Sequence, residues 1–356
     1  MTPTRTALCF SLLPNCMFEF SFVQTPADAP RDTSDLIRPA TEKFDLRVQP
    51  AQPVKGRFAP SPSGRMHMGN IYTALLSWLS ARSQAGSWLL RIEDLDPQRS
   101  KYEFARLIED DLSWLGLDWD EGGLDDRGPA GPYSQSRRGD IYRHYLDRLT
   151  ALGLTYPCYC TRADIMATQA PHQSDGRIVY AGTCRNAPPR PPGTKYSVRL
   201  TVPDRYIEYT DRNYGPQRAN LARECGDFVL RRADGAWAYQ LAVVVDDALM
   251  GVTEVVRGSD LLLSGIQQTY MYQLLGFKAP VFAHLPLVCN AAGQRLSKRD
   301  HTQAMDYLRQ HYTPEEVIGQ AAAMAGLLPA PMPVTAAGLL DAYAKSTFAA
   351  RKRKNF

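Results

Sequence analysis

The hydrophobic positions that follow residue 70 repeat with the spacing of an amphipathic helix. Before them, "VKGRFAP" at 54–60 predicts a short strand that ends at Pro60, and after them "SWLLRIED" at 87–94 predicts a second strand. A strand, a helix and a strand joined through a glycine-containing first turn predict a parallel α/β sheet. The helical positions are Ile71, Ala74, Leu75, Trp78 and Leu79.

Later segments extend this α/β order. Residues 100–115 and 138–152 have helical patterns, and a helical tail is expected from the cap in "YTPEEV" at 312. The run "LAVVV" at 241–245 is continuously apolar, which we interpret as a strand buried on both faces of a parallel sheet.

Between these patterns the chain changes character and predicts an inserted module. From residue 156 to residue 192 it is rich in Cys, Pro, Gly and Thr, and the β-like segments "KYSVRL" and "RYIEYTD" follow. The domains expected are a first catalytic half at 54–155, the module at 156–226, a second half at 227–300 and a helical C-terminal remnant at 301–356.

Residues 1–53 are excluded from the predicted fold. Pro14, Asn15 and Glu19 interrupt a stretch that would otherwise pass for a poor signal peptide. Residues 25–53 are rich in Pro, Asp, Thr and Gln without a sustained period. A disordered extension, or a start codon assigned too early, is expected here.

Composition restricts the class of protein. The 356 residues are 44% hydrophobic and 22% charged, as in a globular protein with a core, and the net charge of +4 neither requires nor opposes a nucleic-acid partner. The basic end "ARKRKNF" is interpreted as a solvated tail. No apolar run approaches the roughly 18 residues that cross a bilayer. Seven unevenly spaced cysteines favour a reduced compartment, the cytoplasm, over a secreted disulfide scaffold.

The stretch "GRFAPSPSGRMHMGN" at 56–70 predicts an anion site where a helix begins. Unpaired backbone N–H groups and the helix dipole favour anions there, and Gly69 would let a ligand lie against the backbone. His67 and Asn70 are three residues apart and are expected on one side of the first turn. A tight turn with a helix-capping histidine explains the same residues equally well.

A second loop motif, "RLSKRD" at 295–300, holds a lysine suited to stabilising charge on a polyphosphate. Taken alone, this motif would be interpreted as a surface loop with a solvated lysine. Together the motifs resemble those of class I aminoacyl-tRNA synthetases: "HMGN" resembles the HIGH motif and "RLSKR" the KMSKS motif. The segments "RFAPSPSG", "RIEDLDPQRS", "AVVVDD" and "VVRGSDLL" are similar to the glutamyl-tRNA synthetase catalytic domain, over about residues 54–300.

This resemblance implies a Rossmann-like parallel-sheet catalytic domain with ATP as substrate, and magnesium is expected with ATP. It implies catalytic roles for His67, Asn70 and Lys298. The chain departs from the motifs at Asn70, where the family has a second histidine, and at Arg295 and Arg299, which replace a lysine and a serine. The implied ATP-binding residues are Pro60, Ser61, His67, Gly69, Asn70, Arg295, Leu296, Ser297, Lys298 and Arg299.

A glutamate pocket needs cationic groups for two carboxylates and an acid for the ammonium group. Arg57, Arg257 and Glu93 lie at predicted strand ends beside the motifs. Alternatively, either arginine could form an ion pair with a structural acid such as Asp94 or Asp246. The resemblance implies that the glutamate site is lined by Arg57, Ala59, Ser61, Glu93, Tyr239 and Arg257.

The cysteines of the module predict one structural zinc ion. Cys158 and Cys160 can direct both thiols to one side of an extended segment, and Cys184 returns after a loop rich in Pro and Gly. Chemistry alone allows His172 as a fourth ligand, whereas the resemblance favours Tyr180. Three reduced free thiols remain the alternative. Cys225 and Cys289 are interpreted as structural.

After residue 299 only 57 residues remain, fewer than a helical anticodon-binding domain needs. With this short C-terminal segment, the chain resembles a truncated paralogous family, the glutamyl-Q tRNA(Asp) synthetases. The resemblance implies activation of L-glutamate by ATP without tRNA, and transfer of glutamate to queuosine in the anticodon loop of tRNA(Asp), by a protein expected to be monomeric. The alternatives are a synthetase that charges a tRNA 3′ end and an inactive zinc-bearing RNA-binding protein.

Overall fold

The structure is a computed structural model that describes residues 53–167, 179–188, 190–288 and 303–346. Residues 1–52 of the predicted extension, His172, Cys289 and the whole 295–299 motif lie outside the described residues.

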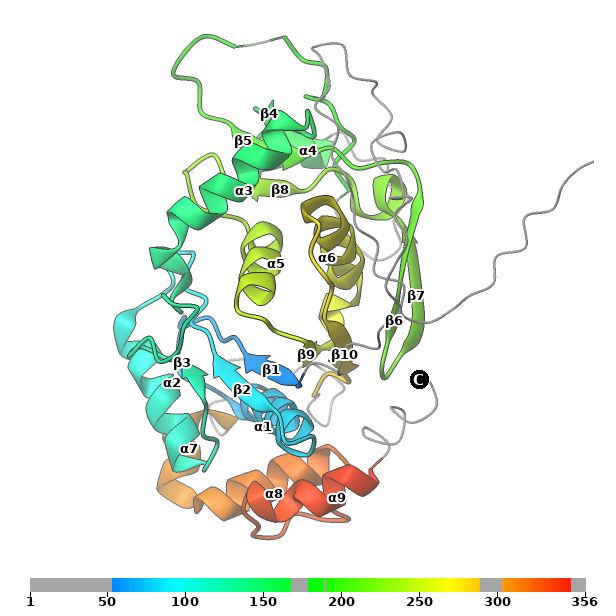
Figure 1. The fold of residues 1–356 in the computed structure, drawn as a ribbon. Coiled ribbons are helices and arrows are strands. Elements are labelled where there is room, and N and C mark those ends of the chain that lie inside the picture. Colours follow the sequence, from blue (N-terminus) through cyan, green and yellow to red (C-terminus); the bar gives the residue numbers. More distant parts are fainter. Residues whose placement is uncertain (1–52, 168–178, 189, 289–302, 347–356) are drawn as a thin grey trace, which may run out of the picture.

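Parallel strands form the centre of the fold, as predicted (Figure 1). β1 (Lys55–Phe58), β2 (Ser87–Leu90) and β3 (Glu121–Gly122) form one sheet, and β9 (Glu254–Gly258) and β10 (Val281–Leu285) form a second parallel pair. The Thr253 N–H donates to the Lys55 carbonyl at 2.9 Å, which places β9 beside β1. Segments from both sides of the inserted module therefore meet here.

The helices of the first half agree with the hydrophobic pattern. They are α1 (Met68–Arg82), α2 (Tyr102–Trp114) and α3 (Gly139–Ala151), with a short 3-10 turn at Gln135–Arg137. The predicted apolar positions of α1 are all buried. This helix packs against β1 and β9 and also against the C-terminal α8 (Pro314–Met324) and α9 (Leu340–Lys345) (Figure 1).

The strand predicted at 241–245 is wrong. These residues lie in the helix α5 (Tyr239–Leu249), whose apolar residues from Leu241 to Val245 are buried without exception. A helix covered on all sides and a strand covered on both faces have the same continuous apolar pattern, so periodicity cannot separate them. α5 packs between α3 and α6 (Leu262–Leu275).

The chain between the two groups of parallel strands contains antiparallel structure. β4 (Thr155–Cys158), β5 (Ser197–Leu200) and β8 (Val229–Arg231) form one sheet, near the short helix α4 (Arg162–Ala167). β6 (Tyr206–Asp211) and β7 (Gly215–Asn220) form a hairpin that is followed by a π-helical turn at Leu221–Cys225. The hairpin runs alongside α6 and reaches β10 (Figure 1).

The predicted helical tail is also present. α7 (Met305–His311) precedes α8, and α8 begins after Thr313, whose side chain forms a capping box with Glu316. Short 3-10 turns precede α6 at Ser259–Leu261 and α9 at Ala337–Leu339. Among the described residues, no helix has the length and apolar character needed to span a membrane.

Candidate active site

A cavity of about 450 Å³ opens where the parallel strands β1, β2 and β9 end. Ligands of open α/β sheets bind at this edge of the sheet. All six residues implied for the glutamate site line the cavity, together with Pro60 and Asn70 from the implied ATP site. His67 and Gly69 are not part of its lining. The six are Arg57, Ala59, Ser61, Glu93, Tyr239 and Arg257.

Backbone hydrogen bonds hold the loop after β1 against the chain that follows β2. The N–H groups of Arg91 and Glu93 donate to the carbonyls of Phe58 and Pro60, both at 3.0 Å. The chain therefore stays extended beyond the ends of both strands, and Ser61 and Glu93 line the same cavity.

The helix-capping role considered as the alternative for His67 is present in the structure. Its Nδ1 accepts a hydrogen bond from the Gly69 N–H at 3.1 Å, while the Asn70 Oδ1 accepts from the His67 N–H at 3.1 Å. These two contacts form a reciprocal capping box at the start of α1. A Cβ atom at Gly69 would lie 3.0 Å from the His67 ring, so glycine here makes room for the capping histidine.

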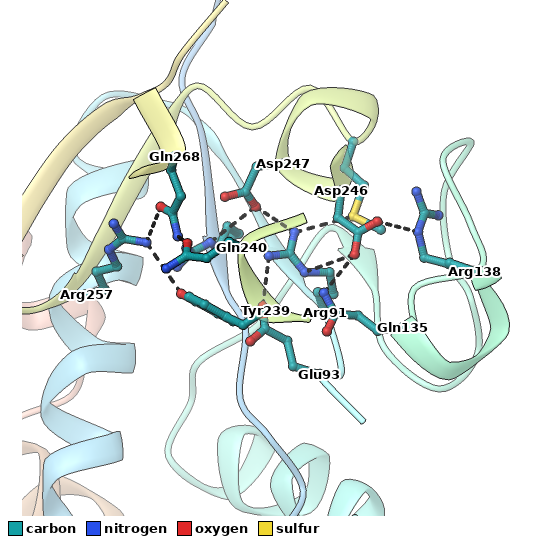
Figure 2. Close-up of polar contacts among 12 residues, drawn as sticks. Arg91, Glu93, Gln135, Arg138, Tyr239, Gln240, Asp246, Asp247, Arg257 and Gln268 are labelled. Atoms are coloured by element: carbon teal, nitrogen blue, oxygen red, sulfur yellow. Dashed lines mark hydrogen bonds and ion pairs between the residues drawn. The ribbon is translucent and has the colours of Figure 1, made fainter. Parts of the chain in front are cut away.

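A buried charge cluster lies at the cavity, and two of its members, Arg57 and Glu93, line it. Figure 2 shows how Arg91 lies between Glu93 and Asp247 in this cluster. Arg91 donates to Asp247 at 2.6 Å and to Glu93 at 3.0 Å, and the Arg57 Nε lies 3.5 Å from Asp247. Arg57 is only 5% exposed, and its Nε has no hydrogen-bond partner among the described residues. Arg57 is thus a buried cation at the cavity wall, with Asp247 at 3.5 Å and the Glu93 charge also acting on it.

The two acids of this cluster respond differently to burial. Burial raises the pKa of Glu93 above its usual value, although Arg91 and Arg57 oppose the shift. Burial also disfavours the charge of Asp247, but Arg91 and Arg57 outweigh it and hold the pKa of Asp247 below its usual range. Asp247 therefore stays ionised beside Arg91 and Arg57, whereas Glu93 is the acid that is protonated more easily as the pH falls.

Asp94 and Asp246, the acids considered as alternative partners of Arg57 and Arg257, are bound to other residues in the structure. Asp246 accepts hydrogen bonds from Arg138 at 2.6 Å and from Gln135 at 2.8 Å (Figure 2). It also accepts from the Tyr142 hydroxyl at 2.7 Å. Asp94 accepts from Ser136. The acid near Arg57 is Asp247, because adjacent helical residues point in directions about 100° apart.

Arg257, on β9, is held by several neighbours (Figure 2). Its Nη1 donates to the Gln268 Oε1 at 2.7 Å and lies 3.5 Å from the Tyr239 hydroxyl, while its Nε donates to the His284 Nε2 at 3.0 Å. Tyr239 is the first residue of α5, so this helix brings its hydroxyl to the end of β9. The arginine is 4% exposed and lines the cavity.

The predicted cysteine cluster is assembled away from the cavity. The ligand atoms of Cys158, Cys160 and Cys184 lie within 4.8 Å of one another. The Tyr180 oxygen lies 3.3 Å from the Cys158 Sγ and 3.6 Å from the Cys160 Sγ, and its ring stacks with Arg199. Burial opposes ionisation of Cys184, but hydrogen bonds from Tyr180 and the Tyr159 backbone outweigh it and lower the pKa to about 7.

Sequence reasoning missed four residues of the site: Arg91, Asp247, Gln268 and His284. A signal existed for the first two, because two acids that directly follow a buried apolar run require buried cationic partners. No comparable pattern marks Gln268 or His284, which reach Arg257 through α6 and β10.

Comparison with known proteins agrees with this geometry. A family model described as "tRNA synthetases class I (E and Q), catalytic domain" matches residues 53–330. A glutamyl-Q tRNA(Asp) synthetase of Nitratidesulfovibrio vulgaris is 47% identical over 284 residues, covering 78% of this chain and 87% of the relative. One of Symbiobacterium thermophilum is 49% identical over 298 residues, covering 81% and 91%.

Solved structures are similar as well. A glutamate tRNA ligase of Elizabethkingia meningosepticum, in complex with its amino acid, has a TM-score of 0.69 and 30% identity, and covers 81% of this chain. This chain spans 64% of the length of that structure. Family match and relatives agree over most of the chain: it belongs to the class I tRNA synthetase family for glutamate and glutamine, and within it to the glutamyl-Q tRNA(Asp) synthetases.

Proposed function

We propose that the protein uses ATP to activate L-glutamate as glutamyl-adenylate and transfers the glutamate to queuosine in the anticodon loop of tRNA(Asp). The observation that carries this proposal is the meeting of Arg57, Glu93, Tyr239 and Arg257 in one cavity at the ends of parallel strands. The names of relatives that are 45–49% identical support the same acceptor.

The charges around the cavity suit glutamate. Arg57, Arg91 and Arg257 contribute three positive charges and Glu93 and Asp247 two negative charges, which leaves one positive charge in this cluster. Arg65, which also lines the cavity, is paired with Asp111 and Asp306. Free glutamate carries one net negative charge, from two carboxylates and one ammonium group. We assign the carboxylates to Arg57 and Arg257, the ammonium group to Glu93 and a supporting hydroxyl contact to Tyr239.

In the first step the glutamate α-carboxylate oxygen attacks the α-phosphorus of ATP. A bond from oxygen to phosphorus forms, the bond to the bridging oxygen of the β-phosphate breaks, and pyrophosphate leaves. No protein nucleophile is needed, so the site acts by positioning and by stabilising charge. Pro60, Ser61, His67, Gly69, Asn70 and the 295–299 motif are the proposed ATP contacts, with magnesium expected on the phosphates.

In the second step a hydroxyl of the queuosine ring attacks the mixed anhydride. An ester forms, AMP leaves, and the hydroxyl proton is lost to solvent or to the leaving phosphate. A catalytic domain that docks on the anticodon loop itself needs no separate anticodon-binding domain. The monomeric state and the cytoplasmic location remain predictions.

Two assays test this function. Glutamate-dependent exchange between ATP and pyrophosphate is expected without tRNA, and exchange that strictly requires tRNA would favour a synthetase that charges a 3′ end. Labelled glutamate should then appear on tRNA(Asp) that contains queuosine. Label on queuosine-free tRNA(Asp), or on tRNA(Glu), would refute the assignment of the acceptor.

We also propose that Cys158, Cys160, Cys184 and Tyr180 bind one structural Zn²⁺. Three converging sulfur atoms and a phenol oxygen in contact with two of them fit a closed four-ligand site. When bound, such an ion supplies on the order of 10 kcal/mol of local folding free energy. The ion would stabilise the cysteine-bearing end of the inserted module, where the described apolar cluster is small.

A further inference from the structure

A buried chain of polar contacts connects the inserted hairpin to Arg257. His284 lies opposite Arg257 in the register of β9 and β10, and its Nε2 is 3.0 Å from the Arg257 Nε. Its Nδ1 is 2.7 Å from the Asp211 Oδ2. His284 and Asp211 are both fully buried.

The contacts determine which ring nitrogen carries the proton. An arginine side chain has only donors, so the Nε2 of His284 must accept from Arg257. The Nδ1 therefore carries the proton and donates it to the Asp211 carboxylate. A second proton on the ring would place two N–H groups against each other. In agreement, burial lowers the pKa of His284, and the charge of Arg257 acts in the same direction.

Asp211 is itself fixed by donors. Its Oδ1 accepts from the backbone N–H groups of Asn213 and Tyr214, both at 2.9 Å, and its Oδ2 accepts from the backbone N–H of His284 at 3.1 Å. Asp211 ends β6, so the turn of the hairpin and the imidazole of β10 share one carboxylate. The position of the ring thus depends on the hairpin turn.

We propose that Asp211 and His284 are positioning residues that orient the Arg257 guanidinium toward the glutamate carboxylate. This inference rests on the proposed function of Arg257. The imidazole occupies the Nε donor, while Nη1 contacts Gln268 and the Tyr239 hydroxyl and Nη2 contacts the Leu261 carbonyl at 3.4 Å, with the side chain lining the cavity. It also makes the hairpin of the inserted module a structural support of the amino-acid site.

The test compares His284→Phe with His284→Gln in glutamate-dependent pyrophosphate exchange. Phenylalanine keeps a flat ring beside Phe282, which stacks with His284 at 6.1 Å, but it has no acceptor. Glutamine offers an oxygen to Arg257 and an N–H to Asp211. The matched control is Tyr209→Phe, which removes a 2.9 Å hydrogen bond from the same hairpin to Leu262 without touching Arg257.

H284F is expected to raise the KM for glutamate about tenfold or more, since a buried charged donor loses its acceptor. The KM for ATP should stay within about twofold. H284Q should recover most of the affinity for glutamate, and Y209F should lower the unfolding temperature while leaving the KM for glutamate unchanged. If H284F does not fold, H284L replaces it in the same comparison.

Three results would overturn the inference: an unchanged KM for glutamate in H284F, equal impairment of H284F and H284Q, or parallel increases in both KM values. The proposed function fails in a different way, because wild-type protein would then show no glutamate-dependent exchange at all.

Discussion

Replacing Asp247 with asparagine removes the negative charge on which the arginines of the buried charge cluster depend. Asp247 is 2.6 Å from the Arg91 Nη1 and 3.5 Å from the Arg57 Nε, and all three side chains are buried. Asparagine has nearly the same shape and keeps one acceptor oxygen. The substitution therefore changes charge and very little volume.

The magnitude follows from the remaining contacts. Removing one partner of a buried ion pair costs about 3–5 kcal/mol. Arg91 retains Glu93 at 3.0 Å and asparagine retains an acceptor, so the lower end applies. We expect D247N to lower the free energy of unfolding by about 3 kcal/mol, which corresponds to roughly 5 °C in Tm for a folded region of this size.

The measurement is the change in Tm of D247N relative to the wild type, compared with the change in Tm of the control variant D118N. Asp118 forms a 3.0 Å ion pair with Arg82 but is 72% exposed, so its loss should shift Tm by less than about 2 °C. Equal shifts in the two variants would refute the idea that Asp247 stabilises a buried cluster.

The pH dependence gives a second check. The pKa of Asp247 lies below its usual value of 3.8, so its stabilisation is present above that value and is lost as pH falls through the lower folded-state pKa. The difference in Tm between wild type and D247N should therefore be constant from about pH 5 to 8 and shrink in stronger acid.

Further predictions concern the cavity and the cysteine cluster. Because burial raises the pKa of Glu93, kcat/KM for glutamate should begin to fall at a pH above the usual carboxyl pKa of 4.5 as the solution is acidified. In E93Q this decrease in acid should be absent, and kcat/KM should be at least about tenfold lower than in the wild type. C184S should lower the bound zinc measured by metal analysis and reduce Tm, whereas C225S should leave the bound zinc unchanged, because Cys225 is not part of the cluster. N70H should leave pyrophosphate exchange intact or raise it, and a large loss would contradict the proposed place of Asn70 at the ATP site.

Sequence alone predicted the residues that meet at the cavity. Arg57, Glu93 and Arg257 each stand at the end of a strand, and ends of parallel strands lie at one edge of a sheet, so their meeting follows from topology. The start of α1 was predicted for a similar reason, because local capping chemistry is encoded within a few residues.

Two other features could not be read from local patterns. The helix at 239–249 was predicted as a strand because burial on every side removes the alternation that distinguishes the two. Asp246, considered only as an alternative partner of the arginines, differs from Asp247 by one helical position, so the acid that faces Arg57 depends on the rotation of that same helix. This rotation could not be predicted from a segment interpreted as a strand.

The joining of β1 to β9 has a consequence for the order of folding during synthesis. Arg57 and Arg91 leave the ribosome 190 and 156 residues ahead of Asp247, and Arg257 and His284 follow still later. Until then the early arginines lack the acid that neutralises them in the folded protein, and the first strands lack their neighbour. The amino-terminal half therefore cannot complete its sheet or its buried charge cluster until residues 247–285 have been synthesised. Slowed translation of the intervening segment would lengthen that interval.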